Sequence, residues 1–594
     1  MAALVTLVCL AAYVAGYRWY ARRLAGPALL ALDDSRVTPA HSLRDDVDYV
    51  PTRPAVLFGH HWASITGLSP MLGPAVAVIW GWAPAVLWVV LGAILVGCVH
   101  DFGSLVVSIR ARGMSIGKVA EGIVGTRAKT LFHLIIFFGI ALAMGVFVYV
   151  IAVLFSIGEG WDPTEPLADP ASFPTAVLPS ALLVLAAVAL GWLHHRRGVR
   201  LGPLTVTGLL LVFWGVWAGL QWPLLGLERG AWPGLEVWIV ILLGYAFLAS
   251  VLPVWSLLQA RDFLNSLLLY LGLGLCYLGI LVTRPEFSAP AFRPHPPGAP
   301  SFFPFVFIII ACGAASGFHS LVASGTTAKQ IDREGDARPI GYGGMIGESL
   351  LGLLAVLATT AGVLGRDGLS AAEVWNHTYA DWDSLQGLGR QVGVFVTGAA
   401  HFIERLGVAD HRTATAFVAM IVVSFALTTL DSATRLLRFN ISEMGETLRL
   451  RVLGNRYVAS SLAVLVIAWF AFFEIEGRPA GLALWRLFGT VNQLLAGLAL
   501  LVVTLYLVQR GRNPWYTGLP MVFMLASTLL AMGRNLVDFW RQRGEGGGPL
   551  FAVGSVLLVL ALWLTAEAAG ALRRFRRQGV LRSLEIDLPD GDRV

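Results

Sequence analysis

Charged residues are scarce in this sequence of 594 residues. Asp, Glu, Lys and Arg make up only 13% of it, about half the share of a typical globular protein. Apolar residues reach 56%, and the mean hydropathy is +0.71. A soluble protein of this size needs a charged exterior that this composition does not supply. The sequence therefore predicts an all-α polytopic membrane protein, in which lipid surrounds the apolar surface.

Cysteines and nucleotide-binding signatures are also few. The four cysteines lie in apolar stretches, without the spacing of a disulfide framework or a metal site. No Gly-rich phosphate loop occurs, and no polar segment exceeds about 35 residues, which is too short for a soluble catalytic domain. These absences argue against an ATP-driven pump, and we expect no cofactor and no bound metal. Basic cytoplasmic loops account for the net charge of +6, so it does not indicate nucleic-acid binding.

Apolar runs of about 18–28 residues recur along the chain, and each can cross about 30 Å of hydrocarbon. The first run is followed by Arg18, Arg22 and Arg23 and preceded by no basic residue, unlike a secretory signal, so we expect a retained helix. We predict about fifteen spans in a lipid bilayer, near residues 2–20, 56–80, 84–109, 131–156, 176–193, 204–222, 234–258, 264–283, 302–324, 340–364, 412–431, 457–474, 481–508, 515–533 and 550–570.

The segments that connect these runs differ in charge. Basic residues gather in 110–130, 194–197, 329–338, 435–456 and 573–577, whereas 158–174 is acidic. With the N-terminus outside, all the basic segments and the C-terminus fall on the cytoplasmic side. This agreement requires 391–409 to be re-entrant or external. We also expect 432–455 to form a short amphipathic helix.

The segment 59–74, GHHWASITGLSPMLGP, brings two His, three Gly and two Pro into one predicted span. Gly permits unusual backbone angles and Pro removes a hydrogen-bond donor, so the helix should break here. Transporters build substrate sites at such breaks; the alternative is a kinked packing helix. We predict substrate-binding residues at Gly59, His60, His61, Ser64, Gly67, Ser69 and Gly73.

Hydroxyl groups recur at helical spacing in a second segment, 313–327, GAASGFHSLVASGTT. One polar face that includes a histidine predicts a lined cavity, whereas the alternative is hydroxyls bonded back to their own helix. We predict substrate contacts from Ser316, His319 and Ser320, and ion or proton coupling at Ser324, Thr326 and Thr327.

A third break is expected at Ser250–Pro253, inside the span 234–258, because Pro253 implies a kink. We predict that Ser250 and Pro253 contact the substrate. Arg261 and Asp262 follow shortly after, and they are interpreted either as part of the site or as a cap at the cytoplasmic surface.

Three acidic residues lie in or at the ends of predicted spans. Glu348 is some eight residues into 340–364, at a depth where a carboxylate needs a partner or water, so we predict a proton carrier. Asp101 and Asp431 are further candidates for coupling, but either could instead form a structural ion pair, an interpretation favoured for Asp431, which has Arg435 one turn later. The histidines titrate near neutral pH, but they could equally be hydrogen-bonded core residues.

These motifs, together with VGCVHDFGSLVVSIRARG, SVLPVWSLLQARD, ARPIGYGGMIGESLLG and TTLDSATRLLRFNISE, resemble the carbon starvation protein A (CstA) family over about residues 40–530. Trp62 and Leu68 stand where the family usually has small residues. The resemblance implies a bacterial inner-membrane carrier for pyruvate or short peptides, active in carbon starvation, with proton coupling proposed. It divides the chain into 1–55, a transmembrane block 56–364, a five-helix block 365–533, and a last helix with a basic tail, 534–594.

The family is also similar to the amino acid–polyamine–cation superfamily, with a LeuT-like core of five-plus-five inverted repeats. That likeness makes 56–80 core helix one, 234–258 core helix six and 302–324 core helix eight. The resulting hypothesis is a symporter for a small carboxylate, driven by H⁺ or Na⁺, with the carboxylate at half-helix N-termini. We expect no enzyme activity; the alternatives are an ion or solute channel and a metal-dependent membrane enzyme.

Overall fold

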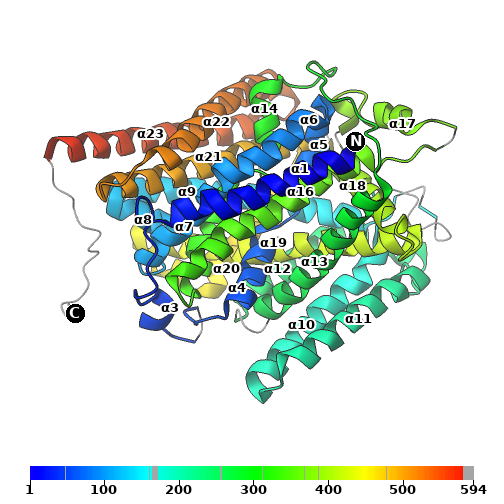
Figure 1. Cartoon of the computed structure of the whole chain (residues 1–594), viewed down its shortest axis with the longest axis horizontal. Helices are drawn as coiled ribbons and strands as arrows, with labels where there is room; N and C mark the ends of the chain where they lie inside the picture. The colour runs from blue at the N-terminus through cyan, green and yellow to red at the C-terminus, as the bar shows by residue number, and fades with distance from the viewer. Residues whose placement is uncertain are drawn as a thin grey trace.

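The protein is a bundle of long, roughly aligned helices (Figure 1). This computed structural model describes residues 1–578 except 47, 159–160, 163–170, 254–256, 311, 367, 386, 476–477 and 480. The acidic Glu159, Glu165 and Asp169 of the segment 158–174 thus lie outside the described residues. Within them, the strands are one short antiparallel pair, β1 (Glu474–Ile475) and β2 (Arg478–Pro479). The all-α class is confirmed.

The helices of the first half run from α1 to α13. They are α1 (Ala2–Ala15), η1 (Gly16–Tyr20), α2 (Ala21–Ala25), α3 (Pro39–Ser42), α4 (Pro54–Ile65), α5 (Ser69–Ala77), η2 (Val78–Trp80), α6 (Trp82–Leu87), η3 (Trp88–Gly97), α7 (Cys98–Arg110), α8 (Ile116–Ile123), α9 (Thr126–Phe155), α10 (Val177–Arg197), α11 (Leu201–Gln221), α12 (Leu235–Val251) and α13 (Leu258–Thr283).

The second half begins with a short helix after a Pro-rich loop. Its helices are α14 (Phe302–Ile309), α15 (Gly317–Gly325), η6 (Thr327–Lys329), η7 (Glu334–Asp336), η8 (Arg338–Tyr342), α16 (Gly343–Ala361), α17 (Ala371–Thr378), α18 (Leu388–Glu404), α19 (His411–Leu448), η10 (Arg451–Gly454), α20 (Arg456–Ala471), α21 (Gly481–Gln509), α22 (Trp515–Arg541) and α23 (Gly548–Gln578).

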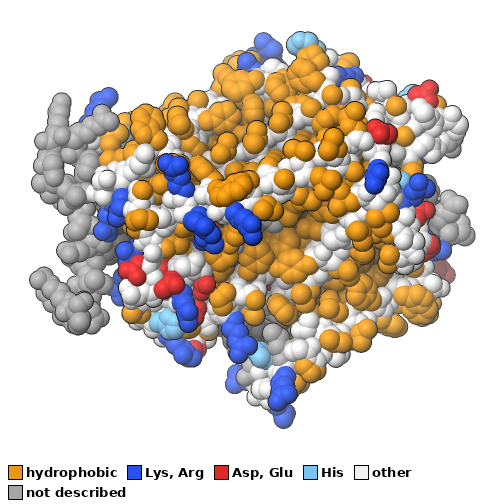
Figure 2. All heavy atoms as spheres, viewed as in Figure 1, with side chains coloured by type: hydrophobic (Ala, Val, Ile, Leu, Met, Phe, Trp, Pro, Cys, Tyr) orange, Lys and Arg blue, Asp and Glu red, His pale blue; other side chains and the backbone are white. Residues whose placement is uncertain are grey.

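Many of these helices can cross a membrane. Among the described residues, 11 are long and apolar enough, and α4 with α5–η2 forms one more span bent by 47°. The helices α12 and α20 are apolar but shorter. Hydrophobic side chains cover most of the face in Figure 2, with charged side chains mainly toward the helix ends, so the chain is a multi-pass membrane protein. The count of fifteen spans stays a prediction.

The basic loops meet at one end of the bundle, called here the basic end. Thr52 bridges to Ile331, Arg110 pairs with Glu334 at 2.6 Å, and the Lys329 ammonium lies over the Tyr49 ring. At the opposite end, the Met1 amino group pairs with Glu286 at 2.9 Å. Lys118 also pairs with Glu443 at 3.7 Å, so the basic segments 110–130, 329–338 and 435–456 share one end, as the charge pattern predicts. Which side of the membrane that end faces stays a prediction.

Two connecting segments differ in how well the sequence predicts them. The helix α18 covers most of 391–409 and is not among the candidate spans. Its start lies near the end of α9, where Gly389 faces Val153. Its end lies near the start of α19, where Glu404 pairs with His411 at 3.0 Å. By contrast, the prediction of a short separate helix over 432–455 is wrong. The helix α19 continues without interruption from His411 to Leu448, because no Gly or Pro stops it before Gly445.

Candidate functional site

Two helices are interrupted in mid-bundle. The first breaks at residues 66–68, between α4 and α5, which confirms the break predicted in 59–74. The second is interrupted after Ile309, where α14 ends, and resumes at Gly317, where α15 begins. The helix α12 instead ends at Val251, so Pro253 lies beyond the helix and not within a span. The break predicted inside 234–258 is therefore wrong, because the proline ends that helix where it was expected to kink it.

The two interrupted helices lie side by side and run in opposite directions. The helix α4 begins at the basic end, beside the bridge from Thr52 to Ile331, and η2 ends at Trp80, whose ring lies against Phe302 at the start of α14. The helix α5 packs on α14, and α4 packs on α15. A hydrogen bond of 2.8 Å joins His61 Nδ1 to Thr327 Oγ1. The antiparallel partner of 54–80 is therefore 302–325.

The first break is enclosed by two continuous helices. A Cβ on Gly67 would lie 2.6 Å from Thr429 Oγ1 of α19 and 3.0 Å from the Phe147 ring of α9. Only glycine allows this close approach, which brings the backbone of the break against both helices. Gly73 likewise lies against the carbonyl oxygen of Ile309, at 2.5 Å from its would-be Cβ, so α5 and α14 touch through backbone.

Polar groups around this break lack partners among the described residues. The N–H groups of Gly67 and Leu68 make no hydrogen bond there, and α5 begins at Ser69 without a side-chain cap. Buried side-chain atoms without a hydrogen bond include Thr66 Oγ1, Ser69 Oγ, His60 Nε2 and His61 Nε2. Unpaired buried groups are costly unless a ligand or water satisfies them. The break is therefore the best candidate for a binding site.

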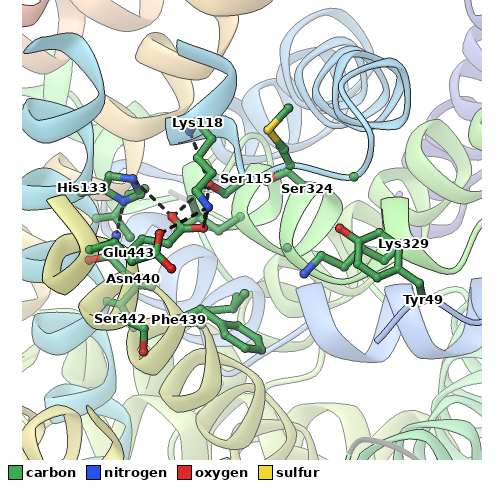
Figure 3. A pocket seen from close by; sticks show the side chains of 18 residues that line it. Tyr49, Ser115, Lys118, His133, Ser324, Lys329, Phe439, Asn440, Ser442 and Glu443 are labelled. Carbon is green, nitrogen blue, oxygen red and sulfur yellow. Dashed lines mark hydrogen bonds and ion pairs between the residues drawn. The ribbon is translucent and has the colours of Figure 1, made fainter. Parts of the chain in front are cut away.

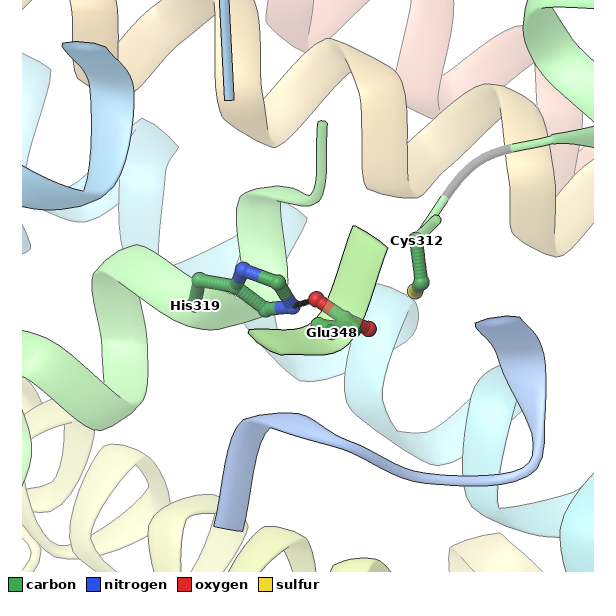
Figure 4. A group of neighbouring side chains, drawn as sticks. All are labelled: Cys312, His319 and Glu348. Carbon is green, nitrogen blue, oxygen red and sulfur yellow. Dashed lines mark ion pairs between the residues drawn. The ribbon is translucent and has the colours of Figure 1, made fainter. Parts of the chain in front are cut away.

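A line of buried titratable groups lies beside the second break. His319 Nδ1 is 2.7 Å from Asp101 Oδ2, and His319 Nε2 is 2.8 Å from Glu348 Oε2 (Figure 4). His100 Nδ1 holds the other oxygen of Asp101, also at 2.7 Å. All four side chains are fully buried. The structure thus brings together Asp101, His319 and Glu348 from α7, α15 and α16.

Cys312 completes the one group of three or more potential metal ligands among the described residues. Its sulfur lies within 4.8 Å of ligand atoms of His319 and Glu348. Two ligands bonded to one zinc ion at about 2.1 Å stand about 3.4 Å apart, whereas Nε2 and Oε2 are 2.8 Å apart. That spacing suits a shared proton better than a metal. His60 and His61 pair elsewhere, so the four residues of the metal-enzyme alternative do not form one centre.

A second buried ionic network joins α4, α12, α13 and α19. His60 Nδ1 lies 2.8 Å from Asp262 Oδ2, and Ser64 donates to the same oxygen at 3.3 Å. Arg261 contacts both Asp262 and Asp431, and Tyr245 donates to Asp431 at 2.7 Å. Arg261 is 1% exposed, so the interpretation of Arg261 and Asp262 as a surface cap is wrong. Asp262 instead reaches the first interrupted helix through His60.

The predicted ion pair between Asp431 and Arg435 is also wrong. Arg435 donates to the carbonyl oxygens of Ala249 and Leu252 at the end of α12, while Asp431 binds Arg261 from another helix. One-turn spacing within α19 suggests the Asp431–Arg435 pair, but the packing of α12 and α13 on α19 provides closer partners for both. Ser250 is held by Ser460 Oγ at 3.0 Å, away from either break.

The hydroxyls of 313–327 mostly satisfy their own helix, as the alternative interpretation holds. Ser320 donates to Gly317, Ser324 to Ser320 and Thr326 to Val322. Ser324 also accepts a hydrogen bond from the backbone N–H of Ile116. Ser316 contacts Asn492, whose Oδ1 accepts from the N–H of Phe318 at the start of α15. A shared hydroxyl-lined cavity is therefore not what this face forms.

A cavity of about 280 Å³ opens between α8, α9, α15 and α19 at the basic end (Figure 3). On one side, His133 and Lys118 face Glu443 at 3.2 and 3.7 Å. On the other, the Lys329 ammonium lies 5.3 Å from the centre of the Tyr49 ring, and desolvation lowers its pKa. Ser324 of α15 also lines this cavity, so the cavity extends from the basic end to the second interrupted helix.

Several site residues were missed from the sequence. For Arg261 and Asp262 the sequence leaves a site role and a surface cap equally open, and it does not single out Tyr245 or Asn492. The length of the helix is the feature that points to Arg261 and Asp262. The helix that ends at Thr283 has 26 residues and includes both of them. Polar residues that lie inside an unusually long span are candidates for burial.

The architecture and these buried polar groups define a multi-pass membrane protein with a polar centre, as transporters have. The chain matches "Carbon starvation protein CstA" over residues 1–531. It is 34% identical to "Peptide transporter CstA" of Mycobacterium tuberculosis, with 90% of this chain and 76% of the relative covered. It is 31% identical to "Pyruvate/proton symporter BtsT" of Escherichia coli, with 90% and 81% covered.

The chain therefore belongs to the carbon starvation protein CstA family, and with these relatives it is placed among transporters and not among enzymes. A solved structure, "MhsT in complex with L-phenylalanine", covers 88% of this chain and 98% of its own at 11% identity. Its TM-score is only 0.39, so that likeness carries no argument.

Proposed function

We propose that the protein is a secondary transporter that imports a small carboxylate together with a proton, pyruvate first and short peptides second. The observation that carries the proposal is the pair of antiparallel interrupted helices beside the buried line Asp101–His319–Glu348. The names of the relatives supply the two substrate classes. By the same analogy the chain resides in the bacterial inner membrane, with its basic end in the cytoplasm.

The carboxylate would bind at the first break. The start of α5 presents backbone N–H groups without partners, and the helix dipole adds partial positive charge there. Thr66, Ser69, His60 and His61 offer unpaired polar atoms nearby. Arg261 is already paired with Asp431 and Asp262, so it is not available to bind the carboxylate. The N–H groups of the break would bind it instead.

The coupled proton would reside on the line Asp101–His319–Glu348. Two buried carboxylates flank one imidazole, so a protonated imidazole still leaves one negative charge in an apolar surrounding. Uptake of one more proton removes that charge. Apart from the ion pair with His319 at 2.8 Å, the oxygens of Glu348 have no hydrogen-bond partner among the described residues, which makes Glu348 the preferred site for this proton.

A proton suits this site better than sodium. The hydroxyls of Ser320, Ser324 and Thr326 already donate to carbonyl oxygens of their own helix, and Ser324 also accepts from Ile116. They are therefore poorly arranged to wrap a cation, whose ligands must converge on one point. Thr327 is likewise held by His61.

The helices also support a core of five-plus-five inverted repeats. We assign α4–α5, α6–α7, α9, α12 and α13 to the first set, and α14–α15, η8–α16, α19, α20 and α21 to the second. Contacts in one set have equivalents in the other. The helix α9 packs on α12 as α19 packs on α20, and α13 packs on α4 as α21 packs on α15. Across the two sets, α5 packs on α16 as α15 packs on α7. In this assignment 302–325 takes the place of core helix six, instead of 234–258.

Uptake by purified protein in liposomes tests the proposal. Labelled pyruvate, dipeptides and tripeptides are supplied with and without an inward proton gradient, and with sodium in place of the gradient. We expect accumulation of one substrate class that depends on the proton gradient. Sodium-driven uptake would overturn the coupling, and absence of uptake for every carboxylate would overturn the substrate class.

A further inference from the structure

A cavity of about 640 Å³ at the basic end is rich in arginine. It lies between the loop that follows α2, the end of α7 and the end of α21. Glu334 is the only acid among its lining residues, whose basic members are Arg36, Arg110, Arg112, Arg510 and Arg512.

The positive charge of this cavity is only partly balanced. Arg36 and Arg110 both pair with Glu334, at 2.9 and 2.6 Å. Among the residues that the structure describes, no carboxylate lies within ion-pair distance of the other three arginines. Arg512 donates to the carbonyl oxygen of Pro27. Several guanidinium groups around one cavity form a typical site for a phosphate group.

An apolar groove of about 660 Å³ begins next to this cavity. It is lined by Trp88, Leu91 and Leu95 of η3 and by Tyr516 and Phe523 of α22. Leu91 and Leu95 are 48% and 46% exposed within a membrane-spanning helix, so the groove opens to lipid. Asn513, which follows Arg512 directly in the chain, lines the groove, and thus the two hollows adjoin.

We propose that these two hollows together bind one anionic phospholipid, with its phosphate among the arginines and an acyl chain in the groove. A soluble phosphate compound would use the arginine cavity alone and leave the groove without a role. A zwitterionic lipid would fill the groove but leave the excess positive charge unbalanced. The combination of charge and apolar surface therefore selects an anionic lipid. This inference does not depend on which substrate the protein carries.

The test uses full-length, delipidated protein in detergent and measures lipid binding by native mass spectrometry and by the shift in melting temperature. The probes are phosphatidylglycerol, phosphatidylcholine and soluble glycerol 3-phosphate. We expect phosphatidylglycerol to bind at least tenfold more tightly than either of the others. Equal binding of both lipids would overturn the role of charge, and equal binding of glycerol 3-phosphate would overturn the role of the groove.

Variants locate the site. The double variant Arg112→Gln/Arg510→Gln removes two guanidinium groups that make no ion pair or side-chain hydrogen bond among the described residues. Arg510 loses only its position over the Tyr506 ring, at 5.6 Å from the ring centre, so we expect the variant to fold. It should lose at least tenfold in affinity for phosphatidylglycerol and keep its affinity for phosphatidylcholine. The control, Arg449→Gln/Arg451→Gln, removes two exposed arginines elsewhere at the basic end. If both double variants bind phosphatidylglycerol like the original protein, the proposed site is wrong.

Discussion

Single buried side chains decide how transport would be coupled to protons. His319 is held on both ring nitrogens, by Asp101 at 2.7 Å and by Glu348 at 2.8 Å, so the imidazole cannot turn without releasing one carboxylate. The sequence identifies all three residues as polar groups within apolar spans. It does not show that they meet, because they lie on three separate helices, with Asp101 218 residues before His319, and only packing brings them together.

The first prediction concerns Glu348→Gln. Glutamine keeps the size of the side chain but cannot release a proton, so we expect proton-driven accumulation of substrate to fall at least tenfold. Exchange of internal for external substrate, which needs no net proton movement, should continue. Both rates can be measured in proteoliposomes.

The matched control for this variant is Glu404→Gln. Glu404 is partly exposed and pairs with His411 at the opposite end of the bundle. Loss of accumulation in the control as well, or unchanged accumulation in Glu348→Gln, would contradict the assignment of the proton to Glu348.

Interrupted helices set the position of the substrate site at the scale of elements. The Gly/Pro content of 59–74 predicts the first break correctly, because these residues act locally on the backbone. The same argument fails for Ser250–Pro253, where the proline ends α12. The second interrupted helix was predicted only as a polar face, since its hydroxyl pattern suits an unbroken helix equally well.

The second prediction concerns Gly67→Val. A Cβ at this position would lie 2.6 Å from Thr429 Oγ1, so the backbone of the break must move away from α19. We expect uptake to fall at least tenfold. The control is Gly244→Val in α12, where a Cβ meets no atom within 4 Å. Full activity of Gly67→Val, at normal thermal stability, would show that the break is not part of the binding site.

The third prediction concerns the start of α19. Asp410 caps this helix, accepting from the Thr413 N–H at 3.3 Å, and hydrogen bonding by Thr413 lowers the pKa of Asp410. Loss of such a cap costs about 1 kcal/mol. Because the folded-state pKa is lowered, the cap stabilises the protein above about pH 4, the unfolded value, and the contribution disappears as pH falls through the folded-state pKa.

The variant Asp410→Ala should therefore melt at a lower temperature than the original protein at pH 7. The difference in melting temperature in detergent should shrink below pH 4. A constant difference over this range would mean that the carboxylate charge has no part in capping α19.

At the scale of the whole molecule, the distribution of charge predicts its orientation in the membrane. The sequence alone predicts that the basic loops share one side, and 110–130, 329–338 and 435–456 do meet at one end. Such long-range agreement is predictable because insertion into a membrane depends on local loop charge. The depth and pairing of the helices were not predictable in this way, since they depend on contacts between distant segments.

The fourth prediction tests this orientation with added cysteines. The four native cysteines are buried, so a membrane-impermeant maleimide should react only with a new exposed thiol. His377→Cys, in α17 at the opposite end, should be labelled in spheroplasts. Arg449→Cys, after α19, should be labelled only in inverted vesicles. The reverse pattern would place the basic end outside the cell.

The position of a bound carboxylate tests the central claim most directly. An experimental structure of the protein with pyruvate or a dipeptide should show the carboxylate within hydrogen-bond distance of the N–H groups of residues 67–69, between the two interrupted helices. A substrate bound only in the cavity beside Lys329, with 54–80 forming one continuous helix, would contradict the account.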